Sequence, residues 1–336
     1  MRGSRARRGP SPTLRAGVRA AAGAAIVASI ALPLARRRLR LPALASAAAT
    51  LAGPLGLAVL APRTKLRDAV LYTMQMWAFT VIHELPYDDP DRLRGRLRIR
   101  YPIRADLALG GGELPNLRLQ RALAIPGRVR PLDRALAIVH WAWFAEPHAA
   151  LLWILLRRDR HFPRAARQLA ATFDIGCAVY FLVPTAPPWW AAENGDIEEE
   201  LARRGAPAEG AAAEAETERV RRVMVEVGQE VWGDAWPGLY GALGGNPWAA
   251  MPSLHFATSL LAAVLLAESA PGAGAVGGAY VAALAVALVY LGEHYAIDLV
   301  AGAALVAAVR LGEPLVAPAA RRLSGALQLL ERIADA

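Results

Sequence analysis

Long apolar stretches alternate with shorter polar stretches over most of the 336 residues. An α-helix needs roughly 17 to 25 mainly apolar residues to cross the hydrocarbon core of a bilayer. Seven stretches are close to that length: 18–35, 43–61, 135–156, 167–184, 253–269, 274–291 and 295–311. A further stretch, 68–83, is apolar enough to lie in the membrane or to cross it. The pattern predicts an all-α fold, a polytopic transmembrane helical bundle of about six or seven spans.

Two polar segments interrupt this pattern. Residues 84–134 contain eleven arginines, seven acidic residues and several prolines, which favours a solvated, partly helical segment outside the membrane. The segment 185–252 begins with prolines and two tryptophans and then becomes rich in alanine and glutamate, which is typical of a surface helix or a linker. We expect Trp189 and Trp190 to anchor the chain at the headgroup layer, and we expect no chemistry at 195–216.

The N-terminus resembles a signal peptide, because a basic stretch precedes an apolar one. Arg36, Arg37 and Arg38 and a second apolar run follow at once, so we expect a retained pair of helices. The chain then divides into four parts: 1–67 with a basic start and two membrane helices, 68–134 as an interfacial and basic extramembrane segment, 135–311 as a membrane domain with the polar loop 185–252, and 312–336 as a basic C-terminal tail.

The composition supports a membrane protein. Hydrophobic residues make up 55% of the chain and aromatic residues only 7%, which argues against a disordered chain, a collagen-like repeat or an ordinary cytosolic enzyme. The formal net charge is +9 and comes almost wholly from arginine, since Lys65 is the only lysine. Because the arginines alternate with apolar stretches, they favour anchoring at a membrane surface, and we expect no nucleic-acid partner. Cys177 is the single cysteine, so no intrachain disulfide and no cysteine-based zinc site can form.

The distribution of arginine predicts an orientation. The short loop 157–167 carries five arginines, whereas the 185–252 loop carries twelve acidic residues against five arginines. Short basic loops lie in the cytoplasm, so we expect 157–167 and the C-terminal tail inside and 185–252 outside. The basic 84–134 segment would also fall outside, against the rule. The protein is then expected in the plasma membrane.

Two patches of reactive residues stand out from the apolar background, 244–259 and 290–302. From His255 to His294 there are 39 steps, which hold an outgoing helix, a turn and a returning helix at about 1.5 Å per residue. An outgoing and a returning crossing end at the same membrane face. The two histidines can therefore meet.

The residues around both histidines suit the chemistry of phosphate. Asp298 lies four residues after His294, so on a helix its carboxylate can orient the imidazole and activate the other ring nitrogen as a nucleophile. Pro252 can open a helix and Ser253 can cap it or donate its hydroxyl, and the N–H groups of that first turn can bind an anion. His255 faces the same anion and can give a proton to a leaving oxygen.

These residues resemble a known family. MPSLH and the downstream GEHYAID look like the second and third signature motifs of the type 2 phosphatidic acid phosphatase superfamily, whose usual forms are Pro-Ser-Gly-His and Ser-Arg followed by His-x-x-x-Asp. Leu254 and the TAPPWW segment are more similar to the inositol phosphorylceramide synthase branch. The resemblance covers roughly 135–311, and it implies a phosphatidic acid phosphatase-like catalytic domain there.

The resemblance implies roles for three residues. In that family the histidine matching His294 attacks phosphorus, the aspartate matching Asp298 orients it, and the histidine matching His255 protonates the leaving group. A phosphohistidine is then hydrolysed or passed to an alcohol. The family implies catalysis without a metal, and we expect no cofactor.

The sequence lacks the basic residues that two of the family's motifs contain. The first motif, Lys-x6-Arg-Pro, is absent, and so is the Ser-Arg before the third histidine. A phosphoryl group needs cationic or N–H donors, so other arginines must bind it. We expect Arg221 and Arg222 to do so rather than Arg164 and Arg167, which the predicted topology places at the opposite face.

Other polar residues in the membrane domain leave alternatives open. Glu146 and His148 lie within an apolar run, where they can contact the substrate or bond two helices together. His140, His83 and His161 are interpreted as structural or peripheral.

Three classes of function fit the sequence. The leading one is a membrane phosphatase or phosphotransferase acting on a lipid-linked phosphate or phosphodiester, with water or an alcohol such as inositol as acceptor. The second is a zinc site built from Glu293 and the three site residues His255, His294 and Asp298. The third is a transporter or scaffold whose buried ionisable residues pair structurally.

Overall fold

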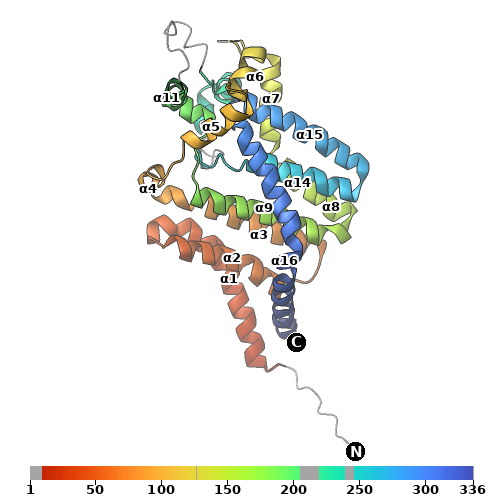
Figure 1. Cartoon of the computed structure of the whole chain (residues 1–336). Helices are drawn as coiled ribbons and strands as arrows, with labels where there is room; N and C mark the ends of the chain where they lie inside the picture. The colour runs from red at the N-terminus through yellow and green to blue at the C-terminus, as the bar shows by residue number, and fades with distance from the viewer. Residues whose placement is uncertain (1–9, 126, 205–218, 239–245, 336) are drawn as a thin grey trace, which may run out of the picture. The chain divides into compact units, whose positions relative to one another are not determined.

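The computed structural model describes residues 10–125, 127–204, 219–238 and 246–335 (Figure 1). In these ranges the regular elements are helices, and β-type pairing is confined to isolated bridges. The chain forms two compact units, one of Met1–Asp88 with Leu311–Ala336 and one of Asp89–Arg310. The long last helix begins in the second unit and ends in the first.

The first unit is built from helices that approach each other closely. It contains α1 (Pro12–Leu39), α2 (Ala43–Leu60), α3 (Lys65–Glu84), the 3₁₀ turn η1 (Leu85–Asp88) and the end of α16 (Ala296–Asp335). A Cβ atom on Gly56 would lie 2.5 Å from the carbonyl oxygen of Ala22, so a glycine is needed where α2 crosses α1. Glu331 of α16 forms ion pairs with Arg63 and Arg67, at 2.6 and 2.9 Å.

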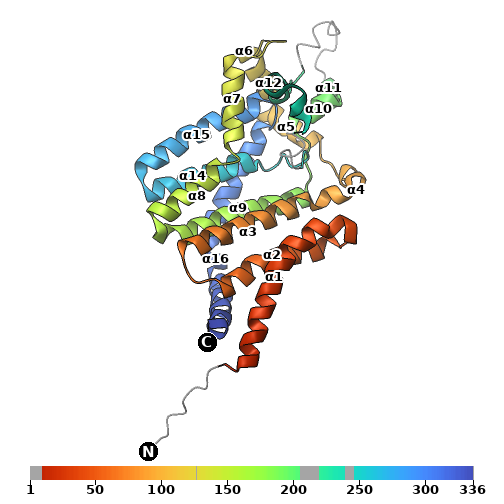
Figure 2. The same ribbon diagram turned by 180° about the vertical axis from the view of Figure 1, so that it is seen from behind.

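The second unit combines long apolar helices with shorter polar ones. Its described helices before α16 are α4 (Pro90–Arg94), α5 (Arg100–Leu109), α6 (Pro115–Leu123), α7 (Pro131–Ala142), α8 (Glu146–Arg157), α9 (Phe162–Leu182), α10 (Pro188–Glu193), α11 (Asp196–Arg203), α12 (Val223–Trp232), α14 (Leu254–Ser269) and α15 (Pro271–Tyr290). Two 3₁₀ turns, η2 (Asp159–His161) and η3 (Gly233–Ala235), lie between them. Helices α8, α9, α14 and α15 lie in layers that α16 crosses, while α5, α6, α10, α11 and α12 gather at one end of the unit (Figures 1 and 2).

Four of the described helices, α1, α2, α15 and α16, are long and apolar enough to cross a membrane. Helix α14 is a shorter apolar helix, and α9 occupies the predicted 167–184 stretch. The structure thus confirms an all-α membrane bundle. The predicted tail 312–336 is helical up to Asp335, because α16 continues without interruption from the last span.

The predicted span 135–156 was wrong as a single helix. Helix α7 ends at Ala142 and α8 begins at Glu146, with Pro147 in its first turn. Proline is favoured in the first turn of a helix because it has no N–H to donate, and it disrupts a helix interior for the same reason. Pro147 therefore starts a new helix, and the break places Trp143 beside His255 of the MPSLH motif.

The segment 84–134 is helical in part, as predicted, but it is not simply solvated. Four apolar residues, Ile103 and Leu107 of α5, Leu117 of α6 and Leu114 just before α6, are buried in one cluster with Tyr295. The arginines of α5 and α6 are exposed on the opposite face of these short amphipathic helices. The composition of the whole segment is therefore polar, although one face of each helix is buried.

Helix α6 holds the loop 291–295 with two amide side chains. The Asn116 Nδ2 group donates to the carbonyl oxygens of Val289 and His294, at 2.7 and 3.0 Å. One turn later, the Gln120 Nε2 group donates to Tyr290 O and to Arg221 O, each at 2.8 Å. Both side chains are buried, so their bonds to these carbonyl groups at the end of α15 and in the loop are made away from water.

Helix α5 caps the start of α16 from outside that helix. The two carboxylate oxygens of Asp106 accept hydrogen bonds from Ala296 N and Ile297 N, at 3.0 and 2.7 Å. The Asp106 side chain is fully buried. Burial raises the pKa of Asp106 to about 6, while the two N–H donors favour its charged form. Helix α16 therefore begins at a position that α5 fixes.

The start of α14 packs tightly against α9 and α16. A Cβ atom on Gly176 of α9 would lie 2.5 Å from a terminal methyl carbon of Leu254, and one on Gly302 of α16 would lie 2.9 Å from Ser253 O. Leu254, the residue that stands where the family pattern has glycine, is thus accommodated by a glycine on the neighbouring helix.

Gly176→Val is expected to lower the free energy of unfolding by about 1–3 kcal/mol, because the added atoms overpack against the buried Leu254. Thermal or detergent-titrated unfolding of the solubilised protein measures this. The matched control is Gly278→Val on α15, where a Cβ meets no atom within 4 Å. Adding Leu254→Gly to Gly176→Val should recover part of the loss, and strictly additive effects would contradict the proposed contact.

Asn116→Ala is expected to destabilise the protein by about 1–3 kcal/mol, since it removes the side-chain donor to the buried His294 carbonyl and one of the two donors to Val289 O. Asn194→Ala is the control, because the Asn194 side chain donates to Trp190 O at an exposed position and its loss should change stability by less than about 0.5 kcal/mol. Equal effects of the two substitutions would mean that the α6 amides do not stabilise the loop.

Candidate active site

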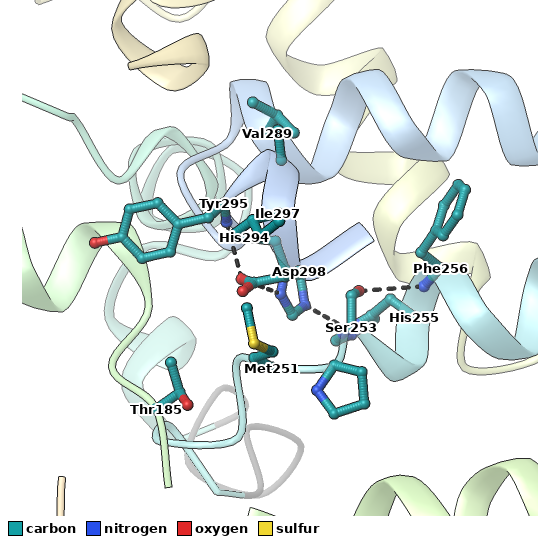
Figure 3. Close-up of polar contacts among 12 residues, drawn as sticks. Thr185, Met251, Ser253, His255, Phe256, Val289, His294, Tyr295, Ile297 and Asp298 are labelled. Atoms are coloured by element: carbon teal, nitrogen blue, oxygen red, sulfur yellow. Dashed lines mark hydrogen bonds and ion pairs between the residues drawn. The ribbon is translucent and has the colours of Figure 1, made fainter. Parts of the chain in front are cut away.

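Three side chains that the sequence predicted to meet lie in one chain of hydrogen bonds. His294 Nδ1 is 3.2 Å from Asp298 Oδ2, and His294 Nε2 is 3.1 Å from His255 Nδ1 (Figure 3). Asp298 and His294 are buried, and His255 is partly buried. His255 lies in the first turn of α14 and His294 in the loop after α15, so the helical hairpin returns the chain as the spacing predicted.

The contacts of Asp298 assign the tautomer of His294. A carboxylate accepts hydrogen bonds, so Nδ1 of the neutral His294 ring carries the proton and Nε2 carries the lone pair. His255 Nδ1 then donates to His294 Nε2. Asp298 Oδ2 also accepts from Tyr295 N at 2.9 Å, which fixes the carboxylate from a second side. The nitrogen with the available lone pair is therefore the one that faces His255.

Ser253 connects the two motifs. Its Oγ atom accepts from Phe256 N at 3.2 Å and so caps α14, as predicted, while its backbone N–H donates to Asp298 O at 3.0 Å. The Tyr180 hydroxyl donates to Pro252 O at 2.7 Å. The capping bond uses an Oγ lone pair, so the Ser253 hydroxyl proton can still be donated to a ligand.

Three segments that are distant in sequence meet beside the site. Thr185 forms parallel bridges with Arg98 on one side and Ala249 on the other. The Thr185 Oγ1 atom is 2.6 Å from the Tyr101 hydroxyl, which also lies 3.1 Å from Met251 Sδ. Figure 3 shows Thr185 and Met251 on the Asp298 side of the histidines. The TAPPWW segment, the first motif patch and the 84–134 segment are thus joined next to the catalytic candidates.

Arg222 lies next to the loop that carries His294. Its Nε atom is 3.4 Å from Glu293 Oε1, and its guanidinium carbon is 3.4 Å from the centre of the Trp189 ring. Burial raises the pKa of Glu293, and the nearby Arg222 guanidinium opposes that rise. Trp189 N also donates to Gly292 O at 3.2 Å. The Arg222 side chain therefore contacts Glu293, the residue directly before His294.

The expectation that Trp189 anchors the chain at the headgroup layer was wrong. Its side chain is only 9% exposed and packs beneath Arg222. Prolines before two tryptophans can precede an interfacial segment, but they can also begin a buried helix. Here Pro187 and Pro188 stand at the start of α10.

The other candidate arginines are held elsewhere. The Arg221 guanidinium pairs with Glu226, with Nε 3.0 Å from Oε1, while its backbone contacts Gln120 and Gly292. Arg164 pairs with Glu268 at 3.3 Å, at the end of α14 that is opposite to Ser253. Because α14 has 16 residues, about 24 Å at 1.5 Å per residue separates these ends.

Glu146 and His148 of α8 both contact neighbouring helices. Glu146 Oε2 accepts from the Ser259 hydroxyl at 2.8 Å, which joins α8 to α14. The His148 ring stacks on Phe173 of α9, with ring centres 5.9 Å apart. These contacts favour the helix-bonding alternative over the substrate-side alternative.

The arrangement of these side chains also bears on the zinc hypothesis. In the ranges that the structure describes, no three or more His, Cys, Asp or Glu side chains are arranged to hold a metal ion. Glu293, the fourth ligand of the zinc hypothesis, is instead paired with Arg222.

Sequence reasoning missed the residues that position this site. Asp106, Asn116 and Gln120 hold the His294 loop and the start of α16, and each is a single polar residue in a polar segment. Trp143 lies with its ring centre 4.1 Å from that of His255, and His140 lies at 4.8 Å. The only available signal for the last two was that the histidine and tryptophans of HWAWFAEPH interrupt an apolar run.

Comparison with known proteins supports the motif resemblance. A family model described as PAP2 superfamily, the type 2 phosphatidic acid phosphatases, matches residues 120–311, which is more than half of the chain and includes both motifs. No curated protein and no solved structure matches the chain. With the matched range covering both histidines and Asp298, the chain belongs to the PAP2 superfamily.

Proposed function

We propose that the protein is an integral-membrane phosphatase or phosphotransferase that acts on a lipid-linked phosphate through a phosphohistidine on His294. The observation that carries this proposal is the hydrogen-bond chain from Asp298 through His294 to His255. Members of the superfamily are generally phosphatases, and the four apolar helices place the site in a membrane-embedded protein. The membrane itself is then the source of the substrate.

In the first step the lone pair of His294 Nε2 attacks phosphorus. The bond between phosphorus and the leaving oxygen breaks, and His255 gives a proton to that oxygen. Phosphorus must come between the nucleophile and the leaving group, so the 3.1 Å contact of the two rings opens when substrate binds. Asp298 keeps the Nδ1 proton of His294 in place and stabilises the positive charge that develops on the ring.

Negative charge on the phosphoryl oxygens needs donors that are already in position. The backbone N–H groups at the start of α14 and the Ser253 hydroxyl can supply hydrogen bonds, and Arg222 can supply charge. A guanidinium has five N–H donors, so the bond from Arg222 Nε to Glu293 is compatible with phosphate binding. Arg221 is the weaker candidate, because Glu226 binds its guanidinium.

In the second step an acceptor attacks the phosphohistidine, the P–N bond breaks and His255 removes the acceptor's proton. Water gives hydrolysis, and an alcohol gives transfer. Leu254 and the TAPPWW segment, whose Thr185 pairs with Ala249 beside the site, favour the inositol phosphorylceramide synthase-like branch as a second candidate. In that reaction a phosphoinositol-type headgroup is passed to a lipid alcohol.

The proposed function is tested by incubating the purified protein with a panel of lipid phosphates and phosphodiesters, with and without inositol and lipid alcohols. Free phosphate and new lipid products are measured separately, which distinguishes hydrolysis from transfer. We expect EDTA to leave the rate unchanged. Loss of activity on chelation that zinc restores would favour the metal hypothesis, and no turnover of any compound would favour a transporter or scaffold.

His294→Ala is expected to abolish turnover, because it removes the atom that forms the covalent intermediate. Mass spectrometry of acid-sensitive phosphopeptides after rapid quenching should find phosphate on His294 in the wild-type protein only. His161→Ala, a partly buried histidine of η2 that lies outside the site, is the control. Activity within a few fold of wild type in His294→Ala would exclude the phosphohistidine on this residue.

His255→Ala should slow alkyl phosphates more than an activated aryl phosphate, because only a poor leaving group needs a proton at the bridging oxygen. General acid catalysis contributes about 10²–10⁴-fold, and we expect a loss in that range for the alkyl substrate. The ratio of kcat/KM for the two substrates measures the effect. A similar loss on both would assign His255 to phosphate binding instead.

We further propose that the active site faces the extracytoplasmic side of the plasma membrane, because the arginine-rich 157–167 loop is expected inside. Single cysteines at Arg160 and Arg203, in a Cys177→Ala background, test this with a membrane-impermeant thiol reagent on intact cells. Labelling at position 203 and protection at position 160 are expected. The reverse pattern would place the chemistry in the cytoplasm.

A further inference from the structure

We propose that His140 is a third functional histidine, whose ring hydrogen-bonds the leaving-group oxygen of the bound phosphoester. The inference rests on the proposed function, because it assigns a further residue to the same reaction. It starts from an unusual feature of α7. His140 is only 8% exposed, and both of its ring nitrogens are buried without a hydrogen-bond partner in the part of the chain that the structure describes.

A buried imidazole without partners is unfavourable in either tautomer. The neutral ring always has one N–H donor and one lone pair, and both lose their hydrogen bonds to water on burial. A histidine that serves only to fill the core could be replaced by an apolar aromatic residue without this cost. The arrangement is explained if a polar group of the substrate bonds to the ring when it binds.

The surroundings of His140 hold the ring in place. The Tyr280 hydroxyl of α15 donates to Val139 O at 2.9 Å, and the Tyr290 hydroxyl donates to the Asp133 carboxylate two turns before His140. Leu136 and Ala137, on the same face of α7, are buried in a cluster with Tyr290. Helix α7 is therefore fixed against α15, and His140 cannot reach water without disrupting these contacts.

The position of His140 indicates which part of the substrate it contacts. Its ring centre lies 4.8 Å from that of His255, at an interplanar angle of 31°. In-line displacement places the attacking nitrogen and the leaving oxygen on opposite sides of phosphorus. His255 is the proposed donor to the leaving oxygen, so a ring beside His255 is close to that oxygen as well.

The proton balance of the reaction is unchanged by this role. His255 transfers its proton to the leaving oxygen, and His140 stays neutral and donates its N–H only as a hydrogen bond. The bond becomes stronger as negative charge develops on the leaving oxygen, so its effect falls on the transition state. His140 then touches the reacting atoms directly.

The test compares His140→Phe, which keeps an aromatic ring but no hydrogen-bonding atoms, with His140→Gln, which keeps an N–H donor. His83→Phe is the matched control, since the His83 ring contacts Phe79 at 5.5 Å in α3, outside the family match. Two quantities are measured on the full-length protein in detergent. They are kcat and KM for the best substrate of the lipid phosphate panel, and the rise in melting temperature that orthovanadate causes.

We expect His140→Phe to lower kcat about 10- to 100-fold, the effect of a lost hydrogen bond to a charged group. Its melting temperature without vanadate should match the wild-type value, and the vanadate-induced rise should be smaller, since the apical vanadate oxygen stands for the leaving oxygen. His140→Gln should retain activity within about tenfold, and His83→Phe should change neither quantity.

Three outcomes would overturn the proposal. Wild-type kcat and vanadate response in His140→Phe would make His140 a packing residue. Equal losses of melting temperature in His140→Phe and His140→Gln, with activity lost in proportion to the folded fraction, would make its role structural. If the wild-type protein neither turns over a panel compound nor responds to vanadate, the proposed function itself fails, and this inference fails with it.

Discussion

The contact between His255 and His294 depends on a five-residue loop, 291–295, that is held by side chains from outside its own helices. Fixing the backbone in one conformation costs roughly 1–2 kcal/mol per residue. The N–H groups of 291–294 donate to carbonyl oxygens at the end of α15, while other groups of the loop are bonded by side chains from α5 and α6. Asn116 and Gln120 bind the carbonyl groups around the loop, and Asp106 binds the N–H groups where α16 begins. The reactive rings are therefore positioned by α5 and α6, which carry no reactive group themselves.

The pairing of the two motifs could be predicted because it follows from regular geometry. A helix rises by a constant amount per residue, so 39 steps with a central turn return His294 to the membrane face of His255. The spacing of Asp298 from His294 also follows from local geometry, and so does the Ser253 cap. Each of these predictions required only the spacing of residues that are close in sequence, or the length of two apolar helices joined by a turn.

The parts that sequence reasoning missed depend on contacts distant in sequence. Asn116 and His294 are 178 residues apart, and a single asparagine in an arginine-rich segment carries no periodic signal. The break between α7 and α8 was hidden because the residues on both sides are apolar, and Pro147 was compatible with either a kink or a new helix. Trp189 faces inward because Arg222, more than thirty residues later, stacks on it, a contact that composition does not indicate.

The position of Arg222 supports the proposal that a site without the usual first motif binds phosphate. An arginine near a buried histidine pair would raise the cost of a positive charge on the rings, unless its own charge were balanced. Glu293 supplies that balance, and the Trp189 ring fixes the guanidinium plane from one side. When a dianionic phosphate enters, the arginine can bind it without leaving Glu293, because carboxylate and phosphate can use different N–H groups of one guanidinium. Positive charge of the kind that the missing motif would bring is thus held in a neutral pair, next to the loop that carries the proposed nucleophile His294.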